Sequence, residues 1–213
     1  MQLSYSQLEV ILTAHFQIHP DKVGTFRARL KQLQRLSFPP GVNVGRGTKM
    51  AYGAEHLFQL VTVLELIHIG LPAATAATIV TKHWPHFAAA YAWAQASIYR
   101  NQLRDRFYAR VLHSSFKEFR SENEISDGVY VENKESLLRV LDINSSRSMY
   151  CYPVICVSDV FQSVTEAAEK IARVQVLSWL DEVNGWFVRR SADTHWLFPY
   201  LPMDRVPGKI PGE

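Results

Sequence analysis

Cysteine is scarce in this chain, and the two that occur cannot pair with each other. Cys151 and Cys156 are the only cysteines among 213 residues. Because they are five positions apart, their side chains on an extended strand point to opposite faces and cannot form a disulfide. No histidine or further cysteine follows at the short spacing of a zinc site. We therefore expect reduced core residues of a cytoplasmic protein, with no metal and no other cofactor.

The sequence also lacks the marks of secreted and membrane proteins. Its start has no basic segment, and Glu9 interrupts the first apolar stretch, so it does not resemble a signal peptide. Of the longest apolar runs, 57–80 is interrupted by Glu65 and His68, while 87–99 is too short to cross a bilayer. A membrane is therefore not among the expected partners.

Motifs for catalysis are equally hard to find. The eight histidines are scattered, and none belongs to a His-Glu-x-x-His pattern. Asp193 and His195 are close in sequence, but no nucleophile motif accompanies them. Aromatic residues within 148–161 could line a small-molecule pocket, although such residues more often form a core. The sequence therefore predicts that the protein is not an enzyme.

Charge is distributed unevenly along the chain. Residues 1–117 contain thirteen lysines and arginines against five acidic residues, a net charge of +8. Residues 118–213 contain ten against fifteen, a net charge of −5. A basic front half and an acidic back half indicate that the front half meets a polyanion.

Two helices are expected at the start of the chain. Ser6 and Glu9 have the spacing of a capping box, which predicts that a first helix begins there. Pro20 is suited to the first turn of a second helix, expected from about 21 to 36. One side of this second helix is apolar at a spacing of three and four residues, through Val23, Phe26, Leu30, Leu33 and Leu36.

A hairpin and a third helix follow. Residues 42–52 contain two short alternating segments on either side of the Gly-Arg-Gly sequence at 45–47, which predicts a small β-hairpin with an arginine at its tip. Residues 54–69 have a continuous apolar face, and Gly70 is a natural residue to end that helix. Pro72 then predicts the start of a short helix that ends near residue 80.

The second half indicates a smaller mixed α/β segment. In order, we expect a helix over 86–112, loops over 114–128, a strand at 129–131, a helix over 133–142, a strand over 148–157, a helix over 159–182 and an irregular tail from 191. Pro153 favours an edge position for the last strand.

Two helices, a hairpin with a basic tip and an apolar helix, in that order, are typical of a winged helix-turn-helix. The second helix fits the major groove of DNA, where arginine, lysine and threonine can contact base edges. The hairpin can place Arg46 against phosphates or in a narrow minor groove. We expect the DNA-binding residues to be Lys22, Thr25, Arg27, Arg29, Lys31, Arg35, Arg46, Thr48 and Lys49.

Over about residues 3–82 the chain resembles the MerR family of transcriptional regulators. The Thr-Phe-Arg sequence at 25–27 is similar to the pattern of that family's recognition helix, although Ala28 and Arg29 stand where aromatic residues are usual. After the hairpin, Tyr52 and Glu55 precede a leucine-rich helix that ends in glycine, as in the family. The family's metal-sensing cysteines are absent, so metal sensing is not carried over.

The expected fold is α+β and mainly helical. We expect a DNA-binding domain over 1–82, a connecting or dimerisation helix over 83–117, and an acidic α/β domain over 118–213 that regulates or oligomerises. The expected function is sequence-specific binding of double-stranded DNA as a homodimer that regulates transcription, with RNA polymerase or another regulator as a further possible partner. The alternative is an adaptor that contacts the transcription machinery without a DNA site of its own.

Overall fold

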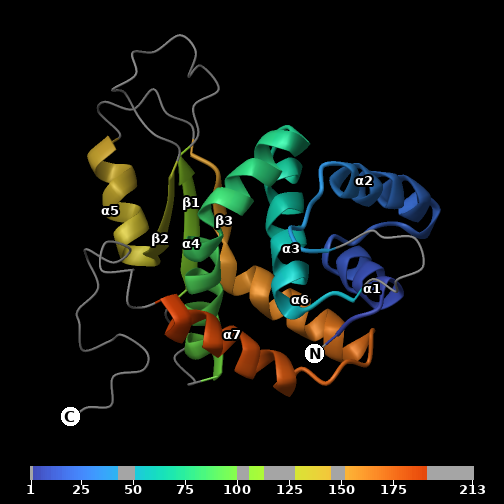
Figure 1. Ribbon diagram of the computed structural model, residues 1–213. Helices are drawn as coiled ribbons and strands as arrows, with labels where there is room; N and C mark the ends of the chain where they lie inside the picture. Colours follow the sequence, from blue (N-terminus) through green and yellow to red (C-terminus); the bar gives the residue numbers. More distant parts are fainter. Residues whose placement is uncertain (1, 43–50, 100–105, 113–127, 145–151, 191–213) are drawn as a thin grey trace. The chain divides into compact units, whose positions relative to one another are not determined.

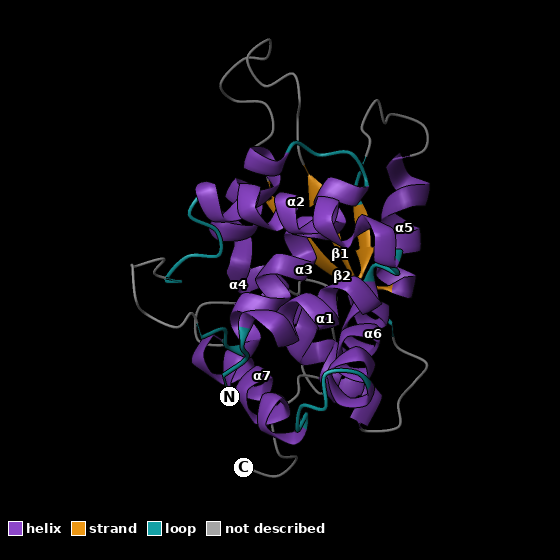
Figure 2. Cartoon of the chain, turned by 90° about the vertical axis from the view of Figure 1, so that its right-hand side faces the viewer, coloured by secondary structure: helices purple, strands orange, loops and turns teal. Residues whose placement is uncertain are grey.

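The computed structural model describes residues 2–42, 51–99, 106–112, 128–144 and 152–190. Helices predominate and the strands form one small antiparallel sheet, which confirms the α+β class (Figures 1 and 2). The chain divides into two compact units. Unit 1 comprises Met1–Trp84 and Asp159–Val183, and unit 2 comprises Pro85–Ser158 and Asn184–Glu213. Across the described ranges, no helix combines the length and apolarity needed to cross a membrane.

This division differs from the three consecutive domains expected from the sequence, because residues 159–183 join the N-terminal helices. In unit 1, Phe58 stacks on Phe161 with ring centroids 5.4 Å apart and meets Trp179 edge-on at 6.2 Å. The acidic residues of 159–183 therefore belong to the same unit as the basic front segment. The sequence of unit 1 contains ten basic and nine acidic residues, so its net charge is only +1.

In unit 1 the first helix, α1 (Tyr5–His15), begins at Ser4 and not at Ser6. The Ser4 hydroxyl accepts a hydrogen bond from the Gln7 backbone N–H, and the Gln7 side chain accepts one from the Ser4 N–H. The predicted capping box at Ser6 and Glu9 was therefore wrong. Glu9 instead turns into the structure and is almost fully buried, with a partner on the next helix.

The second and third helices confirm the expected order with shifted ends. A single 3₁₀ turn, η1 (Pro20–Lys22), leads into α2 (Val23–Arg35), and α3 (Ala54–His68) follows. All of α1, α2 and α3 end in the same way, with a left-handed residue whose φ is +50°, +58° and +104° at Gln17, Ser37 and Gly70. The next N–H then bonds to the carbonyl five residues back: Ile18 to Thr13, Phe38 to Leu33 and Leu71 to Leu66.

The fourth helix, α4 (Ala73–Tyr99), replaces the two helices expected over 72–80 and 86–112. It bends at His83, two residues before Pro85, which removes a backbone donor inside the helix. The prediction for 86–112 was wrong at its C-terminal end, because Phe107–Leu112 forms strand β1. Within unit 2 the ring of Trp93 packs edge-on against Phe107, with centroids 5.1 Å apart.

Unit 2 contains the three-stranded sheet, in the order β2–β1–β3 (Figure 1). Strand β1 pairs antiparallel with β2 (Gly128–Asn133) and with β3 (Val154–Cys156), so β3 lies at an edge, as expected from Pro153. Of the strand expected over 148–157, residues 148–151 lie outside the described residues. Within the described remainder, β3 covers only Val154–Cys156, so the strand is shorter than expected. One face of the sheet is mostly apolar and buried, through Phe107, Ala109, Val111, Val129, Val131 and Ile155.

The opposite face of the sheet carries a buried ion pair. Arg110 and Glu132 have side-chain exposures of 9% and 7%, and the Arg110 Nη2 lies 2.7 Å from the Glu132 Oε1. The Arg110 guanidinium also lies over two rings, 4.6 Å from the centroid of Tyr130 and 5.1 Å from that of Tyr152. The charge of Arg110 is therefore held between a carboxylate and two aromatic faces.

The remaining helices follow the sheet strands. Helix α5 (Lys134–Asn144) confirms the helix expected over 133–142, and the Asn133 side chain caps it by accepting from the Ser136 N–H at 2.8 Å. The single helix expected over 159–182 was wrong: it is two helices, α6 (Val157–Lys170) and α7 (Leu177–Arg190). Arg173, with a φ of +53°, lies in the break. Residues 114–127 and the tail from 191 lie outside the described residues.

Candidate nucleic-acid interface

Helix α2 has one buried side and one exposed side. Phe26, Leu30 and Leu33 are buried in unit 1, at the three-and-four spacing expected from the sequence. Leu36 was expected on the same stripe, but its side chain is 43% exposed because the helix ends at Arg35. The ring of Phe16, just after α1, lies 6.2 Å from that of Phe26, so the turn between the two helices is packed against α2.

The other side of α2 is basic and open to solvent. Six of the nine expected DNA-binding residues lie there or directly before the helix, and all are exposed: Lys22 at the end of η1, and Thr25, Arg27, Arg29, Lys31 and Arg35 on α2. Residues 22–49 contain seven lysines and arginines and no acidic residue. Arg46, Thr48 and Lys49 lie outside the described residues. The positive charge that could meet DNA is therefore concentrated on α2, since unit 1 as a whole is nearly neutral.

The exposed side of α2 has two flanks. A helix turns by about 100° per residue, which places Arg27 and Arg29 about 160° apart around the axis. Ala28 lies between them at the centre of the exposed side, where its small side chain allows a close approach of the helix backbone. Arg27 and Lys31 thus share one flank, and Thr25 and Arg29 share the other.

The Arg27 flank is tied to α1 by a two-point ion pair. The Arg27 Nε donates to both carboxylate oxygens of Glu9, at 2.9 and 2.7 Å, and the Nη2 lies 2.7 Å from Oε1. The Glu9 side chain is only 10% exposed, whereas that of Arg27 is 56% exposed. The hydrogen bond to Glu9, together with its negative charge, raises the pKa of the Arg27 guanidinium.

Glu9 was not recognised from the sequence as part of this site. The available signal was an acidic residue on the otherwise apolar side of α1, beside Leu8 and Ile11. A buried carboxylate requires a charged partner, and Arg27 is that partner.

A second polar contact holds α1 in place. The two ring nitrogens of His15 lie 2.9 Å from the Glu65 Oε1 on α3 and 2.9 Å from the Ser163 Oγ on α6. The His15 side chain is 7% exposed. A single imidazole therefore joins three helices of unit 1, and α1 in turn positions α2 through Glu9 and Arg27.

Backbone hydrogen bonds fix the position of Tyr52, which follows α2 in the sequence and lies just before α3. Leu3 and Tyr52 form an isolated antiparallel bridge with two backbone hydrogen bonds, of 2.7 and 3.0 Å. The Gln34 side chain of α2 donates to the Tyr52 hydroxyl at 3.4 Å, and burial raises the pKa of that hydroxyl. The chain is thus anchored at Tyr52, the last residue of the expected hairpin, against both the N-terminus and α2.

Comparisons with protein-family models, curated proteins and solved structures find no match to this chain. Function must therefore be inferred from the residues themselves. A basic, exposed helix that follows a tight turn and rests on a buried apolar stripe can lie in a groove of a nucleic acid. Its arginine and lysine side chains can bind phosphates, and its polar side chains can contact base edges.

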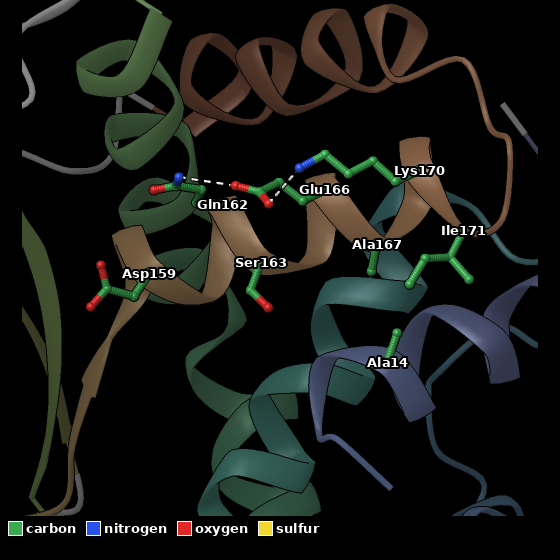
Figure 3. A pocket seen from close by; sticks show the side chains of 8 residues that line it. All are labelled: Ala14, Asp159, Gln162, Ser163, Glu166, Ala167, Lys170 and Ile171. Atoms are coloured by element: carbon green, nitrogen blue, oxygen red, sulfur yellow. Dashed lines mark hydrogen bonds and ion pairs between the residues drawn. The ribbon is translucent and has the colours of Figure 1, made fainter. Parts of the chain in front are cut away.

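Unit 1 also has a shallow groove away from α2, of about 360 Å³. Its floor includes Ala14 of α1 and Ala167 of α6, and Ser163 points toward α1 (Figure 3). On the side away from α1, Glu166 accepts hydrogen bonds from Lys170 and Gln162, each at 3.0 Å, and these bonds lower the pKa of Glu166. Among the described residues, no group of three or more histidine, cysteine or acidic side chains could hold a metal ion.

Proposed function

We propose that this protein binds double-stranded DNA sequence-specifically, through a MerR-like winged helix-turn-helix in its first 82 residues, and regulates transcription. One observation carries the proposal: the exposed side of α2 and Lys22 directly before it present five basic side chains in a stretch of sequence that has no acidic residue. The opposite side of α2 is buried, so the helix has a fixed orientation from which those side chains project.

The order of the elements supports the same proposal. Helix α1, a tight turn and α2 come first, then the glycine-containing segment, and then α3, which ends at Gly70. The bridge between Leu3 and Tyr52 supports a strand at the end of the expected wing. In such a domain α2 lies in the major groove while the wing contacts the backbone or the minor groove. Arg46, at the expected tip, is our candidate for that contact.

The working molecule is proposed to be a homodimer in the cytoplasm that binds a repeated site. Two copies related by a twofold axis place two recognition helices about one helical turn of DNA apart, which matches half-sites spaced by about 10 base pairs. This arrangement multiplies the small number of base contacts that one short helix can make.

Selection from a random duplex library with the full chain, at two salt concentrations, tests the proposal. We expect a repeated sequence to be enriched, and we expect its binding constant to fall by orders of magnitude as salt rises, because phosphate contacts release counterions. Loss of binding at both salt concentrations contradicts DNA binding. In that case a pull-down of purified RNA polymerase subunits tests the adaptor function.

A further inference from the structure

The exposed apolar side chains of unit 2 gather on one short segment. Within the described residues of that unit, the large hydrophobic side chains that are exposed are Tyr130 (47%), Leu138 (50%) and Leu141 (42%). Tyr130 belongs to β2, and the other two belong to α5, which begins directly after β2. Exposed apolar side chains that lie next to one another can mark a protein–protein contact.

Helix α5 rests on the sheet through a different face. Leu137 is buried, and α5 packs against β1 and β2. Lys134, Leu138, Leu141 and Asp142 are all exposed, and at three and four residues apart they form a continuous stripe beside the buried face. We call these four residues the α5 stripe. Glu135 and Arg139 lie farther round the helix and form an ion pair with each other.

We propose that the α5 stripe binds the α5 stripe of a second copy of this chain, with the two helices antiparallel. The twofold axis passes at Leu138, so that Leu138 meets its own equivalent and packs beside Leu141 of the other copy. Lys134 and Asp142 are each four residues from Leu138, on opposite sides along the helix. The same axis therefore brings Lys134 of each copy to Asp142 of the other.

This charge pattern favours a second copy of the chain as the partner that binds the α5 stripe. An antiparallel pair forms two attractive Lys–Asp contacts, whereas a parallel pair in register places like charges together. The stripe is thus complementary to itself, which is what a twofold interface requires. An 11-residue helix buries less area than a standard stable interface, so the dimer that α5 forms is weak.

The inference names the surface for the dimer in the proposed function, and it can be tested without DNA. Sedimentation equilibrium of the full chain, over about 1–200 μM, measures the dimer constant in the micromolar range expected of small interfaces. We expect Lys134→Asp and Asp142→Lys each to weaken dimerisation by about tenfold, because two attractive pairs become repulsive. The double variant with both changes should restore it, because the pairs are re-formed with exchanged signs.

Two further variants distinguish this surface from others. Leu138→Glu should abolish the dimer, whereas Ile69→Glu, which alters an exposed apolar residue of unit 1, should leave it unchanged. Circular dichroism confirms that each variant is folded. A chain that stays monomeric throughout, or a double variant that is no better than its single parents, overturns the proposal. DNA selection on the wild-type chain is a separate measurement, so failure of DNA binding and failure of this interface are distinguishable.

Discussion

Glu9 holds Arg27 through both of its carboxylate oxygens, and this contact fixes α2 relative to α1. The acid is buried and the base is largely exposed, so the pair lies at the boundary between the core of unit 1 and the surface proposed to face DNA. The Nε edge of Arg27 neutralises Glu9, while its side chain remains 56% exposed on the surface proposed to face DNA.

Replacement of Arg27 by methionine should destabilise the folded protein. Glu9 would then keep a buried charge without its partner, and the cost of that desolvation is not recovered. We expect the melting temperature of Arg27→Met to fall, and the double variant Glu9→Gln, Arg27→Met to recover most of the loss. Lys31→Met, on the same flank of α2, is the matched control and should melt close to wild type. An unchanged melting temperature for Arg27→Met would show that Glu9 does not need this partner.

The expected hairpin and α2 should contribute differently to DNA binding. Arg46→Ala should lower affinity for all sequences alike and reduce the salt slope by about one, as the loss of one phosphate contact does. Arg29→Ala, and a change at Arg27, should in addition alter the preferred sequence, at a cost of about 1–3 kcal/mol for the favoured base pair. Titrations on the selected site and on single-base variants of it measure both quantities.

Arg139→Ala is the control for these titrations, because it removes an exposed arginine of unit 2 that is paired with Glu135. Its affinity should equal that of the wild type. If Arg27, Arg29 and Arg46 can all be replaced without effect on binding, then α2 and the expected wing do not contact DNA.

The sequence predicted the parts of unit 1 that depend on local patterns. Alternation of apolar and basic residues located α2 and separated its buried Phe26 from its exposed Arg29. Gly70 was correctly expected to end α3, since glycine adopts positive φ without strain. Gln17 and Ser37 adopt the same conformation at the ends of α1 and α2, but non-glycine residues give no such signal in advance.

Contacts between residues that are far apart in the sequence could not be predicted from local sequence patterns. The local sequence pattern predicts that Glu9 belongs to a helix cap. Its actual partner, Arg27, lies 18 residues away, on the side of α2 that is expected to bind DNA. Residues 107–112 were assigned to a helix, because their strand pairing depends on segments 128–133 and 154–156. The two halves of the sequence do differ in net charge. The fold, however, places 159–183 in the same unit as the basic segment, so the opposite charges nearly cancel within unit 1.

His15 should be important for stability although it is a single polar residue. Its replacement by alanine leaves Glu65 and Ser163 without their shared partner and opens a small space between α1, α3 and α6. We expect a loss of about 1–3 kcal/mol in the free energy of unfolding, measured by urea denaturation. His68→Ala is the control, because that residue is exposed at the end of α3, and it should change stability by less than about 0.5 kcal/mol. Equal effects of the two substitutions would contradict the role assigned to His15.

In unit 2, loss of one partner of the ion pair between Arg110 and Glu132 should destabilise the folded protein. Both side chains are more than nine-tenths buried, so removal of either one leaves an uncompensated charge inside the protein. Arg110→Met should lower the free energy of unfolding by about 3–5 kcal/mol, whereas Arg110→Met combined with Glu132→Met should lower it much less. Arg139→Met, an exposed arginine of the same unit, should be nearly neutral. A double variant as unstable as Arg110→Met alone would show that packing of the Arg110 side chain between Tyr130 and Tyr152, and not its charge, stabilises the sheet.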